Sequence, residues 1–234
     1  RFTKYVCYAL GEIVLVVIGI LIALQINNWN ENQKEREAEQ KLLTQLQKDL
    51  EKNVKDLNYN LFLQNESIRS AEILLNHMHN NLPYHDSLRL HFSKSFVWTK
   101  FVVNSGAYQT LKSRGVEIIS NPYLRDQILN IYEGNLNWLE KLETTIINHG
   151  EKMRTEDGYE FFSKMNAITY KEGEVTFGET EVIDYETLRK SKKFKYYLNS
   201  FLNQNKILKN AVTIDYIDEH LRTIQMINKE LKNE

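Results

Sequence analysis

Four of the six histidines in this chain fall within one stretch, "HMHNNLPYHDSLRLH", at positions 77 to 91. Three of them and a neighbouring aspartate offer the imidazole and carboxylate donors that hold zinc or another divalent ion. However, the first two are only two residues apart and would point to different sides of a helix. The sequence leaves open a solvated histidine-rich loop or a metal site. The metal ligands would be His77, His79, His85 and Asp86.

Other residues that could carry chemistry give weaker patterns. "RTEDGYE", at 154–160, resembles a calcium loop but lacks its regular alternation of oxygen ligands, so a polar turn is the better interpretation. "KSKKFKYY", at 190–197, is basic and aromatic, yet the chain balances 30 Lys and Arg against 31 Asp and Glu. A solvated helix face is therefore favoured over a nucleic-acid site. Phosphate-binding loops and Gly-x-Ser-x-Gly are absent from the sequence. We expect no enzyme activity, no cofactor and no nucleic-acid partner.

The most informative stretch is "GEIVLVVIGILIALQINNWNE", at 11–31. From Tyr5 to Ile26 the chain carries one charge, and these 22 residues make about 33 Å of helix, enough to cross a bilayer core. A signal peptide would have a shorter apolar region and a small-x-small cleavage site. A buried helix of a soluble core is the other alternative. We predict a transmembrane helix.

Aromatic residues flank this segment as they do at membrane interfaces. Trp29 follows it, and Tyr5 and Tyr8 take the matching place at its start. Lys and Arg counts hardly decide the orientation. Because long downstream domains are translocated largely regardless of charge, we expect a cytoplasmic N-terminus and a periplasmic C-terminal domain.

Within the predicted span, Glu12 is the costly residue. Either it sits at headgroup level, or it contacts a neighbouring helix. Gly11, Gly19 and Ala23 share one stripe with small side chains, which lets another helix approach closely. Gly11, Glu12, Gly19 and Ala23 are thus the candidate helix–helix contact in the membrane.

Beyond the span, the sequence predicts an all-α elongated bundle. Residues 1–28 form the span and its flank, 29–82 a long stalk helix, 83–183 middle helices with an irregular segment, and 184–234 a return helix. Apolar residues at helical spacing mark the buried side of the stalk, and a kink is possible near 27–32.

Asp86 can cap a helix over 87–103, a short helix can run from 104 or 105 to Gly115, and Asn121-Pro122 can begin another that reaches about 148. "ITYKEGEVTFGE" is compatible with a hairpin, and Asp184 can cap the last helix. The aromatic residues of "FVWTKFVV" and "YEFF" are expected in the core.

The opening "GEIVLVVIGILIALQINNWNE", followed by a charged helix, resembles a large family of Bacteroidetes membrane proteins of unknown function. The likeness extends more loosely through "AYQTLKSRGVEIISNPYLRDQILNIY", at 107–132. It implies a single span with a basic N-terminal stub, a helical domain outside the cytoplasm, and a place in a bacterial inner membrane. It implies no activity, so it assigns no functional residue.

These observations favour a membrane-anchored scaffold or adaptor subunit that contacts lipid and assembles with itself or with another membrane protein. The alternative is an extracytoplasmic ligand sensor that signals through a partner membrane protein. An enzyme that uses the histidine cluster is a third and weaker hypothesis.

Overall fold

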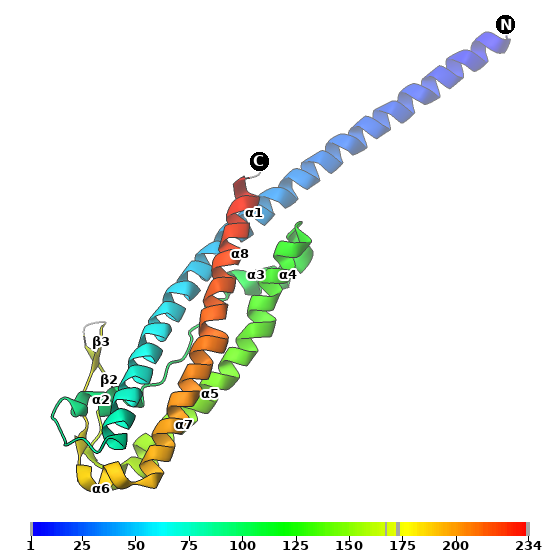
Figure 1. Ribbon diagram of the computed structural model, residues 1–234. Helices are drawn as coiled ribbons and strands as arrows, with labels where there is room; N and C mark the ends of the chain where they lie inside the picture. The colour runs from blue at the N-terminus through cyan, green and yellow to red at the C-terminus, as the bar shows by residue number, and fades with distance from the viewer. Residues whose placement is uncertain (1, 167, 172–173, 233–234) are drawn as a thin grey trace.

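The computed structural model describes residues 2–166, 168–171 and 174–232, and the side chains of residues 12, 14–166 and 176–232 (Figure 1). Within these residues the fold is almost entirely helical, as predicted, with two small two-stranded sheets. One helix extends far beyond the bundle at its N-terminal end (Figure 1). The bundle itself consists of three long helical rods.

The first rod is a single helix, α1 (Phe2–His79). The second contains α4 (Pro122–Leu129), the π-helical η2 (Asn130–Asn135), α5 (Leu136–Lys152) and the π-helical η3 (Met153–Asp157). The third contains α7 (Lys192–Leu208), the π-helical η5 (Lys209–Thr213) and α8 (Ile214–Lys232). The first two rods run in the same direction, and the third returns antiparallel to both (Figure 1).

Local capping chemistry sets where the second rod and α6 (Tyr185–Lys190) begin. The Asn121 side chain accepts hydrogen bonds from the Tyr123 and Leu124 N–H groups, and Pro122 occupies the first helical position. Asp184 accepts from the N–H groups of Glu186 and Thr187, which starts α6. Both predicted caps are confirmed.

The predicted helix over 87–103 is wrong in extent. Helix α2 (Leu88–Ser95) ends early, and Asp86 does not cap it, because the N-cap is Ser87 and makes no side-chain cap bond. Residues 96–105, which we call the crossover, are extended and lead back along the bundle to α3 (Gly106–Arg114) and η1 (Val116–Ile118) (Figure 1). Several of its residues are β-branched or aromatic, which favours extended backbone over helix.

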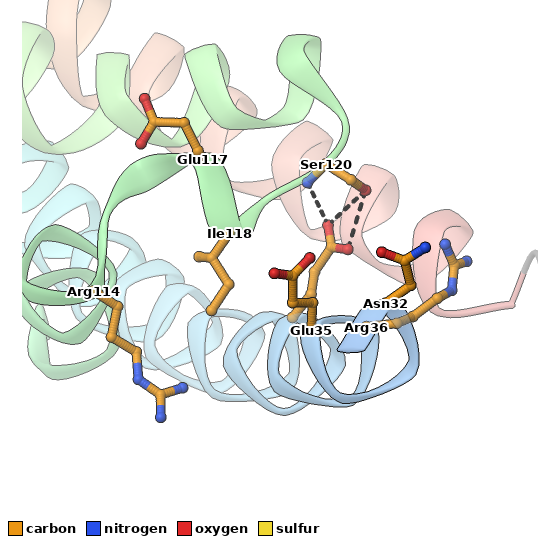
Figure 2. Close-up of a pocket in the computed structure, with 8 residues that line it drawn as sticks. Asn32, Glu35, Arg36, Arg114, Glu117, Ile118 and Ser120 are labelled. Carbon is orange, nitrogen blue, oxygen red and sulfur yellow. Dashed lines mark hydrogen bonds between the residues drawn. The ribbon is translucent and has the colours of Figure 1, made fainter. Parts of the chain in front are cut away.

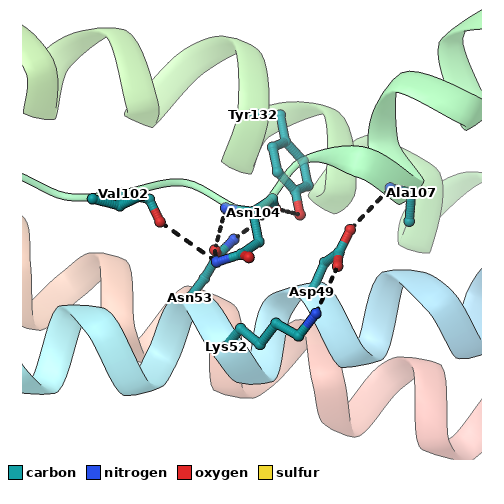
Figure 3. Close-up of polar contacts among 7 residues, drawn as sticks. All are labelled: Asp49, Lys52, Asn53, Val102, Asn104, Ala107 and Tyr132. Atoms are coloured by element: carbon teal, nitrogen blue, oxygen red, sulfur yellow. Dashed lines mark hydrogen bonds and ion pairs between the residues drawn. The ribbon is translucent and has the colours of Figure 1, made fainter. Parts of the chain in front are cut away.

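A stripe of polar side chains on α1 satisfies the backbone of the crossover and its neighbours. Asn53 accepts from the Asn104 N–H at 2.7 Å and donates to the Asn104 carbonyl at 3.2 Å (Figure 3). Asp49 accepts from the Ala107 N–H at 2.9 Å (Figure 3). Other members contact Ser95, Thr99, Val102 and Ser120. We call this stripe the polar seam. Its members are Glu39, Asp49, Asn53, Asp56, Gln64 and Ser67.

Toward the C-terminal end of α1, the residues of the polar seam contact progressively earlier residues of the segment from Ser95 to Ser120. Glu39 meets Ser120, and Ser67 meets the Ser95 carbonyl. At 100° per residue the seam residues fall within an arc of about 100° around the helix axis, so they occupy one side of α1. An extended chain without a neighbouring strand has backbone groups that need partners when buried, and the seam supplies them.

The irregular region between the second and third rods holds η4 (Gly158–Glu160) and both sheets. The predicted hairpin is confirmed: β2 (Ile168–Lys171) pairs antiparallel with β3 (Glu174–Phe177). The second sheet, β1 (Phe162–Lys164) with β4 (Glu181–Val182), was not predicted, and its register shifts between Phe162 and Lys164.

The predicted return helix is also corrected, because it is broken at Ser191. That residue has extended backbone and accepts a bond from the Phe194 N–H, so it ends α6 and caps α7. Helix α1, in contrast, continues without a break through residues 27–32, where a kink was considered possible. The predicted domain limits at 82 and 184 fall just after the end of α1 and just before the start of α6.

The core runs the length of the bundle and becomes aromatic at the end where α1 finishes. Phe92 and Phe96 of the α2 region each make edge-on contacts with Phe194 of α7, with ring centroids 6.0 Å apart in both pairs. Phe161 and Phe162 join this cluster, so the expectation that both aromatic stretches lie in the core is confirmed for Phe96, Phe161 and Phe162. It is wrong for Tyr159, which is 74% exposed. Gly150 permits the close approach, since a Cβ there would lie 2.9 Å from Trp98 Cδ1.

We predict that Asn53→Ala lowers the free energy of unfolding by about 1–3 kcal/mol, because it leaves the part-buried Asn104 N–H without its partner and removes one of the two hydrogen bonds to the Asn104 carbonyl, which keeps that of the Tyr132 hydroxyl. Asn58→Ala is the matched control on the exposed face of α1, where the amide bonds only the Val54 carbonyl of the same helix. Urea unfolding of the full chain in detergent measures both. Equal, small changes in the two variants would show that the polar seam does not hold the crossover.

Candidate functional site

The apolar part of α1 lies outside the bundle. From Val14 to Ile26 its large side chains are 46–71% exposed. Among the described residues, α1 is the one helix that is long and apolar enough to cross a membrane, judged by length and composition. Glu12 is exposed, Trp29 is 67% exposed, and a Cβ added at Gly19 would meet nothing within 4 Å. Ala23 is likewise exposed.

Three of the predicted residues of this segment cannot be placed in the same way. The side chains of Tyr5 and Tyr8, and the surroundings of Gly11, lie outside the described residues. Their predicted roles at the interface and in helix contact stay predictions.

A groove of about 640 Å³ opens where α1 enters the bundle (Figure 2). One wall is α1, and the other is the segment that joins α3 to α4. We call it the η1 groove. It is lined by Asn32, Glu35, Arg36, Glu39, Arg114, Glu117, Ile118 and Ser120.

The base of the η1 groove is fixed by Glu39, which is only 6% exposed. One of its carboxylate oxygens accepts from the Ser120 N–H at 2.7 Å, and the Ser120 hydroxyl lies 2.9 and 3.0 Å from the two oxygens (Figure 2). The next residue, Asn121, donates to Glu230 of α8 at 2.9 Å. All three rods are thereby tied together at this end.

The rim of the η1 groove carries both signs of charge. Glu35, Glu117 and Arg114 are exposed, and Arg114 lies at the opposite end from Asn32 (Figure 2). Ile118 supplies an apolar side chain between them. A mixed polar rim around a partly apolar surface is typical of protein–protein contacts.

The structure does not gather the histidine stretch into a metal centre. His77 and His79 are on α1, His85 lies in the following turn with Nδ1 2.9 Å from the Ser87 hydroxyl, and Asp86 is exposed. His91 instead contacts the Ser70 hydroxyl at 3.1 Å. Across the described part of the chain, no three His, Cys, Asp or Glu side chains come close enough together to hold a metal.

Sequence reasoning missed a buried carboxylate in the middle of the bundle. Glu143 of α5 is 2% exposed and accepts from the Phe101 N–H of the crossover at 2.9 Å, while its Oε2 has no partner among the described residues. Burial raises the pKa of Glu143 to about 7, although the Phe101 bond acts in the opposite direction. Its spacing from Leu139 and Ile146 places Glu143 on the apolar face of the helix. This spacing was the signal from which its burial could have been predicted.

His220 of α8 is a second buried ionisable group that the sequence did not reveal. It is fully buried, and its Nδ1 lies 2.8 Å from the Tyr216 carbonyl, so this nitrogen carries the proton. Burial lowers the pKa of His220 to about 4. The bundle interior therefore favours the neutral forms of both Glu143 and His220.

Comparison with known proteins finds one similarity. A sequence model described as a family of unknown function (DUF6090) matches residues 12–169. The match includes the apolar segment, the whole polar seam and the η1 groove, and ends within β2. No curated protein and no solved structure matches.

The buried Glu143 predicts a pH dependence of stability. Because its pKa rises from 4.5 to about 7 on folding, its neutral form predominates in both states only well below pH 4.5. Between pH 4.5 and 7 the unfolded chain loses this proton first, so stability falls by up to about 3 kcal/mol. Glu143→Gln removes this loss.

The measurement is the unfolding free energy of the wild type minus that of Glu143→Gln at pH 5 and at pH 8. Taking the difference cancels the opposing contribution of His220, which lowers stability on acidification. Glu37→Gln, at an exposed position of α1, is the control and leaves the profile unchanged. A difference that does not vary with pH would contradict the prediction.

Proposed function

The chain belongs to this family of unknown function, and we propose that it is a membrane-anchored helical scaffold or adaptor, with one N-terminal span and a bundle outside the cytoplasm. The observation that carries the proposal is the wholly exposed apolar segment from Val14 to Ile26. Soluble monomers rarely expose a continuous apolar surface of this size, and lipid is the surrounding in which it is stable.

The continuity of α1 supports a scaffold role. The same helix forms the span and the first rod, with no break at Trp29. The η1 groove begins at Asn32, three residues further on, or about 5 Å along the helix axis. A protein anchored in the same bilayer would meet this groove first, and its mixed rim suits a polar protein segment.

We place the protein in a bacterial inner membrane with the N-terminus in the cytoplasm and the bundle in the periplasm. This orientation follows the default for a short N-terminal flank and a long C-terminal domain. In the span, Glu12, Gly19 and Ala23 are proposed to face a neighbouring helix, either of a second copy or of another membrane protein. A structural rather than a catalytic role fits these features.

The alternative function is an extracytoplasmic ligand sensor that signals through a partner membrane protein. A pocket of about 400 Å³ between α1 and α7 favours it. The residues that line it come from the last turns of α1 and the first turns of α7, and these turns lie at the end of the bundle away from the apolar segment (Figure 1), where a soluble ligand would have free access.

We predict that the double variant Ile18→Lys, Ile22→Lys moves the protein from the membrane to the soluble or degraded fraction. Each charge at the centre of a span costs about 2.5–3.5 kcal/mol in insertion. The control is Ile207→Lys, which changes an equally exposed isoleucine on α7. Alkaline extraction of membranes followed by immunoblotting separates the outcomes. An unchanged membrane fraction for the double variant would exclude the span.

The adaptor role is tested by crosslinking in native membranes. A photo-crosslinking amino acid at Glu117, on the rim of the η1 groove, is expected to give a discrete adduct with a membrane protein or with a second copy. The same amino acid at Tyr159, which is 74% exposed at the far end, is the control and gives none. Absence of any adduct from Glu117 would argue against docking at this groove.

A further inference from the structure

The pocket at the far end of the bundle is bounded by the last turns of α1 and the first turns of α7, which lie side by side (Figure 1). We call it the α7 pocket. Its volume of about 400 Å³ is within the range of small-molecule sites. It is lined by Leu75, Asn76, Met78, His79, Lys195 and Asn199.

The lining combines apolar side chains with converging polar groups. The half-buried Leu75 offers apolar surface to the pocket, and Met78, which is 2% exposed, closes its floor. Asn76 Oδ1 accepts from the Asn80 side chain at 2.8 Å, which leaves the Asn76 amide hydrogens as donors. Asn199 has the opposite arrangement: its amide donates to the Lys195 carbonyl at 2.8 Å, so its oxygen can accept.

The charge of the α7 pocket is positive, because its lysine lacks a carboxylate partner. Lys206, further along α7, pairs with Glu72 at 2.6 Å. Lys193, two residues before, pairs with Asp157 at 2.8 Å and with Glu160 at 2.6 Å. Lys195 makes no ion pair with any residue that the structure describes. The residue is half-buried, and an anion bound beside its ammonium group would accept a charge-assisted hydrogen bond.

We propose that the α7 pocket binds a small aliphatic carboxylate. Its carboxylate group would bond the Lys195 ammonium and the Asn76 amide, and its alkyl chain would lie over Leu75 and Met78. His79 adds a donor on the α1 side. The histidine singled out as a possible metal ligand thus belongs to an anion site. The proposal does not depend on the membrane anchor and would give the sensor alternative its ligand class.

The test uses butyrate with the full-length protein in detergent, followed by NMR or titration calorimetry. Saturable binding is expected, and Lys195→Gln should weaken it about tenfold, because one charge-assisted hydrogen bond is lost. Lys192→Gln is the matched control: it removes the same charge from the same helix at an exposed position outside the pocket. It should leave the affinity within about twofold.

One further ligand and one further variant complete the experiment. Butylamine has the same chain and the opposite charge and should not bind, and Asn76→Ala should weaken butyrate binding without removing a charge. Three outcomes would overturn the proposal: no saturable butyrate binding up to about 50 mM, equal weakening by the two lysine variants, or equal binding of butylamine.

Discussion

The structure depends on one constraint: an extended segment that crosses the bundle without a neighbouring strand must find partners for its backbone. The polar seam of α1 provides them, with Asn53 and Asp49 at its centre. Because the crossover carries the chain from α2, which packs on α1, back to α3, the parallel placement of the first two rods follows from it. Glu143 adds a contact from the second rod through Phe101, so three segments meet at this line.

Helix α1 has two parts that differ in their side chains. Its first part is apolar and exposed on all sides, whereas its second part carries an apolar stripe for the core beside a polar stripe for the crossover. Glu39 lies at the beginning of the second part, and its bonds to Ser120 hold the connection between α3 and α4 against the helix. The η1 groove is a direct product of that contact, since Ser120 and its neighbours form the second wall.

Local signals were sufficient wherever structure is decided within a few residues. The long α1, the caps at Asn121 and Asp184, and the hairpin of β2 and β3 all follow from composition, capping residues and turn signals. The early end of α2 was not predictable in this way, because the residues that hold the crossover extended lie 46–58 positions earlier, from Asp49 to Asp56. The break at Ser191 was missed because serine, although favoured as an N-cap, is also found inside helices, so it does not mark a boundary by itself. The η1 groove and the α7 pocket required knowledge of which helices are neighbours.

The π-helical turn η5 bears on how this fold can change in length over evolution. Leu208 and His220 face the same core, and 12 residues separate them, whereas three α-helical turns need about 11. The wide turn accommodates the surplus residue and returns the side chains of α8 to the correct phase. Loss of one residue between 209 and 213 would leave an ordinary α-helix with both buried faces still aligned. The same loss elsewhere in α7 or α8 would rotate everything after it by about 100°. Descendants of this chain can therefore shed a residue at η5 while the rest of the rod keeps its length.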